Sequence, residues 1–178
     1  MVRLTWVLST GLMAPTTSTE PQLREQVTKA LGRRSFCVLA TASPAGEPHA
    51  VSVLYAAVGT TLYVHTLRDT VKARNVAANP HVAVCVPVRR LPVGPAMAVQ
   101  FRGRAELVEQ DDPEILRLIE DGSLKKIVVG DALEDPRGCF LRITPDGRVG
   151  TYGIGMPIRK VLRDPLSAIG SVRLTTGS

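Results

Sequence analysis

Aromatic residues are scarce in this chain, and the segments that mark several other classes of protein are missing. Aromatics make up 4% of the 178 residues, too few for the base-stacking surfaces of single-stranded nucleic-acid binders. No apolar run reaches the ~18 residues of a membrane-spanning helix. No dense block of lysine and arginine indicates a nucleic-acid-binding tail. A basic β-barrel that binds nucleic acid stays an alternative, and a membrane protein is not expected.

Cysteine is also rare and follows no pattern. The three cysteines, Cys37, Cys85 and Cys139, lie far apart, and none of them forms a C-x-x-C motif. Their wide spacing and odd number argue against a disulfide framework. Two of them lie inside apolar runs, where cysteine behaves as a small hydrophobic residue. We therefore expect reduced thiols in a cytoplasmic protein.

The motifs of several common active sites are absent as well. The chain has no G-x-G-x-x-G after a strand, no Walker A motif and no G-x-S-x-G. Its histidines, His49, His65 and His81, lack metal-ligand spacing, so we expect no metal site. The chain does carry a net positive charge, formally +6, and its pI is about 9.7. A net positive charge favours an anionic partner such as a phosphorylated cofactor.

Short strands separated by turns are predicted to fill most of the chain. We expect residues 1–19 to be a flexible N-terminal extension and 20–178 to form a single domain. Strands are predicted at 35–43, 49–58, 61–66, 81–88, 96–109, 138–145 and 147–155, the last two as a hairpin around Pro145-Asp146-Gly147. Six or seven antiparallel strands predict a mainly β fold closed into a small barrel, because closure removes exposed edges. An open α+β sheet is the alternative.

Helices are predicted between and after these strands. One begins at Thr19-Glu20-Pro21 and ends at Gly32. A second covers 111–122, with a buried stripe formed by Ile115, Leu116 and Ile119. Residues 123–135 show no clear pattern, and 157–172 are predicted to contain a short helix.

The segment "HTLRDTVKARNVAANP" (65–80) joins two predicted strands through a short helix with basic residues at its start. Asp69 or Thr70 can cap this helix, and its other first-turn N–H groups attract an anion together with the helix dipole. The polar and basic side chains that could bind the anion are Thr66, Thr70, Lys72, Arg74 and Asn75. The pattern predicts a phosphate site, and a solvated basic helix face is the alternative.

The order of these features resembles the pyridoxamine 5'-phosphate oxidase-like split-barrel superfamily. The resemblance rests on "VLATASPAGEPHAVSVLYAAVGTTLYVHTLRDTVKARNVAANPHVAVCV" followed by "VQFRGRAELVE", within residues 30–110. It implies a six- to seven-stranded antiparallel split β-barrel that forms a homodimer with two cofactor sites at the subunit interface. The implied cofactor is FMN or the deazaflavin F420, and in some branches haem.

The resemblance also implies roles for individual residues. The cofactor phosphate would lie at Thr66–Lys72, and His65 falls where the oxidases carry an aromatic residue. Three residues match the strand that lies along the isoalloxazine ring: Val51, Ser52 and Val53. Val71 replaces an arginine of the oxidases' phosphate-binding triplet, and their C-terminal Arg-x-His motif is missing. The chain is therefore more similar to flavin and deazaflavin oxidoreductases than to true pyridoxamine phosphate oxidases.

The implied function is hydride transfer between bound F420 or FMN and a small organic substrate. A non-catalytic cofactor- or haem-binding split barrel is the alternative. The cofactor-binding candidates are Val51, Ser52, Val53, His65, Thr66, Thr70, Lys72, Arg74 and Asn75. The candidates for catalytic proton transfer are His65, whose ordinary pKa suits that role, and Tyr152.

Overall fold

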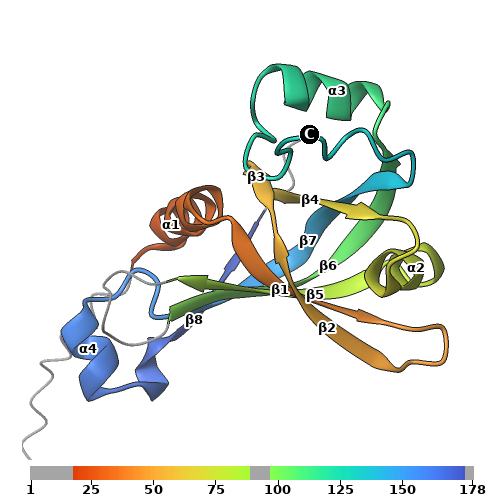
Figure 1. The fold of residues 1–178 in the computed structure, drawn as a ribbon. Coiled ribbons are helices and arrows are strands. Elements are labelled where there is room, and N and C mark those ends of the chain that lie inside the picture. The colour runs from red at the N-terminus through yellow and green to blue at the C-terminus, as the bar shows by residue number, and fades with distance from the viewer. Residues whose placement is uncertain (1–17, 89–96, 175–178) are drawn as a thin grey trace, which may run out of the picture.

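The computed structural model describes residues 18–88 and 97–174, which fold into one curled antiparallel sheet with helices around it (Figure 1). The strands are β1 (Phe36–Ala42), β2 (Pro48–Leu54), β3 (Ala56–Val58), β4 (Thr61–Leu67), β5 (His81–Val88), β6 (Met97–Glu109), β7 (Gly138–Tyr152) and β8 (Ile169–Arg173). The helices are α1 (Glu20–Arg33), α2 (Val71–Ala78), α3 (Pro113–Glu120), α4 (Ile158–Arg163) and the 3-10 helix η1 (Leu166–Ala168). The predicted mainly β class is confirmed. Most of the predicted N-terminal extension, 1–19, lies outside the described residues.

The order of the strands makes the sheet curl. It runs β2-β1-β5-β6-β7-β4-β3, and β8 pairs with β7. The strands β2 and β3 stand at opposite ends of this order, yet only Tyr55 separates them in the chain. The two ends of the sheet must therefore approach each other, and β2 does lie near β4. The result is the half-barrel seen in Figure 1.

The single strand predicted over 49–58 is wrong at Tyr55, where the chain leaves one neighbour and joins another. Tyr55 is fully buried. Its backbone N–H donates to the carbonyl oxygen of Ser35 at 2.8 Å, and its hydroxyl donates to that of Leu31 at 2.9 Å. These bonds hold the corner at which β2, paired with β1, becomes β3, paired with β4. The residues around the corner all favour strands, so the sequence pattern does not reveal it.

The hairpin predicted over 138–155 is also wrong, because β7 is one long strand that pairs with β6. Pro145, Asp146 and Gly147 form an irregularity inside this strand and do not reverse the chain. Gly147 adopts a φ of 74°, which only glycine reaches without strain. Proline and glycine close together in a sequence indicate a turn, but the same residues also occur where a strand continues past a break in its hydrogen bonds to the neighbouring strand.

Gly103 of β6 lies opposite this irregularity. The β6–β7 register shifts between Phe101 and Gly103. A Cβ atom on Gly103 would lie 2.4 Å from the carbonyl oxygen of Thr144, which is far inside van der Waals contact. Gly103 therefore lets the two backbones approach each other closely at the bulge.

The predicted helices form, with small differences at their ends. Thr19 precedes α1 and donates its backbone N–H to the Gln22 side chain at 3.0 Å, as in half of a capping box. The helix ends at Arg33, one residue beyond the predicted end. After α4, β8 adds an unpredicted strand within 157–172. No helix in the described ranges is both long and apolar enough to span a membrane.

The prediction for α3 is correct in its cap and wrong in part of its buried face. The Asp112 carboxylate accepts a hydrogen bond from the backbone N–H of Glu114 at 2.8 Å. Ile115 is buried as predicted, but Leu116 is exposed and Leu118 is buried instead.

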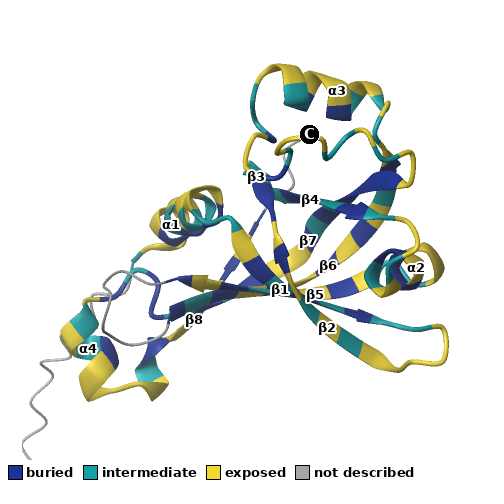
Figure 2. Cartoon of the chain, in the orientation of Figure 1, coloured by how far each residue is buried: buried dark blue, intermediate teal, exposed yellow. Residues whose placement is uncertain are grey.

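Two apolar clusters form the core, and Figure 2 shows how buried residues are distributed over the strands and helices. The larger fills the inside of the half-barrel and includes the buried face of α1. The smaller lies on the opposite face of β4 and β7, beneath α3 and residues 124–127. Successive residues of β4 therefore contribute to different clusters: Val64 to the larger, and Tyr63 to the smaller. This alternation determines which side chains of β4 can share a site.

Candidate functional site

The turn between β4 and α2 leaves the start of the helix without a cap. Thr70 occupies the N-cap position with extended backbone angles, but no side chain in the described part of the chain caps the helix. Its hydroxyl instead donates back to the carbonyl oxygen of Leu67 at 2.8 Å. The N–H groups of the first helical turn have no intrahelical partner, so they are available to an anion.

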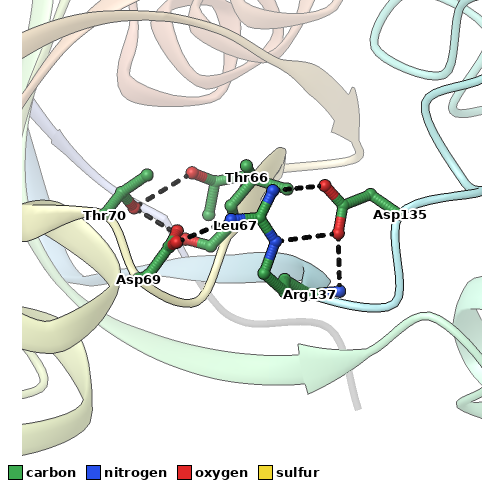
Figure 3. A network of polar contacts seen from close by, with 6 residues as sticks. All are labelled: Thr66, Leu67, Asp69, Thr70, Asp135 and Arg137. Carbon is green, nitrogen blue, oxygen red and sulfur yellow. Dashed lines mark hydrogen bonds and ion pairs between the residues drawn. The ribbon is translucent and has the colours of Figure 1, made fainter.

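The hydroxyl of Thr66 lies beside this helix start (Figure 3). Its oxygen is 3.2 Å from that of Thr70. Because the one hydroxyl hydrogen of Thr70 is used by Leu67, Thr66 is the donor in this pair. Thr66 is only 7% exposed and pairs across the ladder with Cys139 of β7. The structure therefore brings together two of the predicted phosphate ligands.

Lys72 adds a positive charge to the same helix turn. Its side chain is half-buried, and burial lowers the pKa of its ammonium, an effect that the neighbouring Cys139 thiol opposes in part. Within the described residues, no hydrogen bond or ion pair joins this ammonium to another side chain. A partly desolvated cation without a counter-ion favours a bound anion. We call Thr66, Thr70, Lys72 and the uncapped N–H groups of α2 the anion site.

Asn75 and Arg74 point to different surroundings. Asn75 is 6% exposed, and its amide donates to the hydroxyl of Thr41 on β1 at 3.0 Å. It therefore anchors the buried face of α2 to the sheet. Arg74 is exposed on the helix. Among the described residues, no side-chain hydrogen bond joins either of them to Thr66 or Thr70.

His65 lies on the opposite face of β4 from Thr66. Its ring meets that of Phe140 edge-on, with 5.0 Å between centroids, and its Nε2 is 3.3 Å from the Nε2 of Gln110. Burial lowers the pKa of the imidazole, partly offset by the charge of Asp135. A Cβ on Gly138 would overlap Gln110, so this glycine leaves room for the glutamine beside His65.

The strand β2 provides a free backbone edge near α2. It stands at the end of the sheet and, among the described strands, pairs only with β1. Alternate backbone groups on its other side therefore lack a ladder partner within these strands. Along it, Val53 is buried, Val51 half-buried and Ser52 exposed. Contacts between β2 and α2 bring this edge close to the helix of the anion site.

Tyr152 is far from His65 along the sheet. His65 pairs with Phe140 near the start of β7, whereas Tyr152 is the last residue of that strand. The two positions on β7 are on the order of 40 Å apart along the strand. Within one chain, these two candidates cannot act on the same reacting group.

The sequence did not indicate the ion pairs around the anion site. Arg137 bonds to Asp69 and Asp135 (Figure 3), and Arg68 bonds to Glu109. Asp135 and Arg137 belong to a segment without helical or strand periodicity, so no pattern predicted that this segment returns to the turn before α2.

Two adjoining hollows of about 430 and 560 Å³ lie elsewhere, on the outward face of β1, β5 and β6. Small apolar residues such as Ala40 and Ala83 form part of their lining, and Arg102 and Arg148 lie beside both. The two hollows are open and shallow compared with an enclosed ligand cavity. They mark a long outward sheet face that none of the helices within 18–88 and 97–174 covers.

The sequence matches a protein family over most of the described sheet. The family model described as pyridoxamine 5'-phosphate oxidase matches residues 23–147. No curated protein matches the chain by sequence.

Several solved structures share the fold. The haem storage protein HutZ of Vibrio cholerae matches with a TM-score of 0.62 at 18% identity, over 75% of this chain and 96% of that one. An FAD-binding protein of Mesorhizobium loti gives 0.59 at 24% identity, over 71% and 90% of the two chains. A protein named F420 reductase gives 0.52 at 23% identity, over 66% and 91%.

Proposed function

The chain belongs to the pyridoxamine 5'-phosphate oxidase family, and we propose that it is an oxidoreductase that transfers a hydride between bound FMN or F420 and a small organic substrate. Its site combines an uncapped helix start, two hydroxyls and a cation. A fold shared with an F420 reductase and an FAD-binding protein supports this class of cofactor. Val71, which stands where the oxidases carry an arginine, argues against a true pyridoxamine phosphate oxidase.

The unpaired, half-buried ammonium of Lys72 is the observation that carries the proposal. A solvated basic helix face would expose this lysine fully or pair it with a carboxylate, and neither is seen in the described residues. The phosphate of FMN or the phosphodiester of F420 would accept hydrogen bonds from Lys72 and the N–H groups of α2, and from Thr66 if its hydroxyl turns from Thr70 to the phosphate. The donors present thus suit a phosphorylated cofactor.

The chain's own residues would bind and orient such a cofactor. The free edge of β2 at Val51–Val53 offers backbone donors and acceptors to a planar heterocycle. The edge and the anion site would hold the two ends of one molecule and so fix its orientation. When bound, the flavin or deazaflavin supplies the hydride chemistry. The proposed proton donors are His65, which lies on the face of β4 opposite Thr66, and Tyr152, at the far end of β7. Their separation means that only one of them serves a given site within one chain.

We also propose that the protein is a homodimer, as the family resemblance implies. The outward face of the sheet includes Phe36 and Leu54, which are 43% and 57% exposed and lie opposite each other in the β1–β2 register. Large apolar side chains on an uncovered sheet suit burial against a second copy. The three cysteines form no disulfide, which suits the reducing cytoplasm that we propose as its location.

A second candidate function is cofactor or haem binding without catalysis. The fold similarity to a haem storage protein favours it. So does the anion site itself, because its Lys72 ammonium attracts an anion but is a poor proton donor at neutral pH.

Titration of the purified protein distinguishes these functions. FMN, F420 and haemin are each added to ligand-free protein, and binding is followed by visible absorption. The proposal predicts saturable binding of FMN or F420 and substrate-dependent bleaching or recovery of its absorption band. If FMN or F420 binds but the bound cofactor exchanges hydride with none of a panel of acceptors, the second function is favoured. Haemin binding alone would do the same.

A further inference from the structure

Arg137 holds the turn before α2 with both its side chain and its main chain (Figure 3). Its Nε and Nη2 donate to the Asp135 carboxylate at 3.1 and 2.7 Å. Its Nη1 donates to Oδ2 of Asp69 at 2.9 Å. Its carbonyl oxygen accepts from the backbone N–H of Arg68 at 2.9 Å. One arginine therefore connects the start of β7 to the residues that precede the anion site.

This network is poorly placed to stabilise the fold. The side chains of Arg137 and Asp69 are 56% and 55% exposed, and ion pairs that exposed contribute little to the free energy of unfolding. The network is nevertheless well formed. Hydrogen bonds from Arg137 lower the pKa of Asp135 to about 2, so this carboxylate stays ionised at neutral pH and keeps the guanidinium in place.

Asp69 is the residue whose position matters for the anion site. It directly precedes the N-cap residue Thr70, and aspartate in such a position readily accepts from a backbone N–H two residues on, here that of Val71. It also lies three residues before Lys72, a spacing at which opposite charges attract each other on a helix. A free Asp69 carboxylate would therefore compete with a phosphate for the same donors. In the structure it turns to Arg137 instead, and α2 stays uncapped.

We propose that Arg137 is a positioning residue that holds the Asp69 carboxylate away from the start of α2 and so keeps the anion site open to the cofactor phosphate. The inference rests on the proposed function, because it concerns the same site. Asp135 fixes the guanidinium from the other side, through the two-pronged contact that suits an arginine and a carboxylate. Arg137 then acts through Asp69 and does not itself touch the phosphate.

The test compares Arg137→Ala, Asp69→Ala and the double variant in titrations with FMN and F420, with riboflavin as the ligand that lacks phosphate. Arg137→Ala should weaken binding of the phosphorylated cofactor roughly two- to fivefold, the size of one charge effect at a helix start, and leave riboflavin unchanged. Asp69→Ala should bind the cofactor at least as tightly as the natural protein. The double variant should recover the natural affinity, because the competing carboxylate is gone.

The recovery separates this role from the alternatives. If Arg137 contacts the phosphate directly, the double variant stays as weak as Arg137→Ala, and the inference is wrong. It is equally wrong if Asp69→Ala weakens binding, or if Arg137→Ala leaves affinity unchanged. Thermal unfolding of each variant checks that the fold is retained. A natural protein that binds riboflavin as tightly as FMN, and that does not bind F420, would overturn the proposed phosphate site as well.

Discussion

The hydroxyl oxygens of Thr66 and Thr70 lie 3.2 Å apart, and Thr70 uses its hydrogen on the carbonyl oxygen of Leu67. This arrangement has a direct consequence for α2. A side chain at the N-cap position commonly accepts a hydrogen bond from a free N–H group of the first turn. The Thr70 side chain turns away from the helix instead. The open donors, the two hydroxyls and the Lys72 ammonium then form one electropositive site at the end of β4.

Lys72→Ala should weaken binding of FMN or F420 roughly 10- to 100-fold, because a hydrogen bond to a charged group contributes about 1.5–3 kcal/mol. The thermal midpoint should not fall, since the variant removes a half-buried charge that has no partner in the described residues. Absorption titration and thermal unfolding measure the two effects. Arg74→Ala, an exposed cation two residues further along the same helix, is the matched control and should bind normally.

The affinity for the phosphorylated cofactor should also fall at alkaline pH. Burial lowers the pKa of Lys72 below its ordinary value, so the ammonium is present at neutral pH and is lost as the pH rises through that lowered pKa. Affinity for the phosphorylated cofactor should fall over the same range. A Lys72→Arg variant keeps its charge there. The affinity of the natural protein is divided by that of Lys72→Arg at each pH, so that the titration of the cofactor itself affects both equally. A ratio that stays constant with pH would rule out this role of the lysine.

Thr70→Val should reduce cofactor affinity about three- to tenfold, on the order of one neutral hydrogen bond. Valine keeps the shape of the side chain and removes both the bond to Leu67 and the acceptor for Thr66. Thr70→Ser keeps the hydroxyl and should bind almost as the natural protein does. Equal affinities of the valine and serine variants, measured by the same titration, would show that the hydroxyl has no part in the site.

Gly103→Ala should destabilise the fold by about 1–3 kcal/mol. Its Cβ would lie 2.4 Å from the backbone oxygen of Thr144, which cannot move without disturbing the β6–β7 ladder. Gly150→Ala, in the same pair of strands, places its Cβ an ordinary 3.5 Å from the nearest atom and should change stability by about 0.5 kcal/mol or less. Urea unfolding of both variants gives the comparison. Similar losses in the two would contradict the close approach at the bulge.

The sequence predicted the strands well because most of them are short, apolar and bounded by turn residues. It failed at Tyr55 and at Pro145–Gly147 for opposite reasons. The corner at Tyr55 is made by hydrogen bonds to Ser35 and Leu31, which no local pattern reveals. Pro145–Gly147 has the local pattern of a turn, but pairing with β6 keeps the strand continuous.

The site was predictable only where its residues are neighbours in the chain. Thr66, Thr70 and Lys72 come from one strand-turn-helix segment, and the structure brings them together. The alternation along β4 separates His65 from Thr66, and helical geometry turns Asn75 toward Thr41. Contacts from distant segments, such as Arg137 to Asp69, depend on the tertiary fold and could not be read from either segment alone.

The central claim is that the start of α2 binds a cofactor phosphate, and paired ligands test it most directly. The affinity of the natural protein is measured by calorimetry for FMN and riboflavin, and for F420 and the same deazaflavin without its phosphate-linked tail. The account predicts that at least one phosphorylated cofactor binds, and binds at least about tenfold more tightly than its phosphate-free counterpart. Equal affinities within both pairs, or no binding of either phosphorylated cofactor, would contradict it.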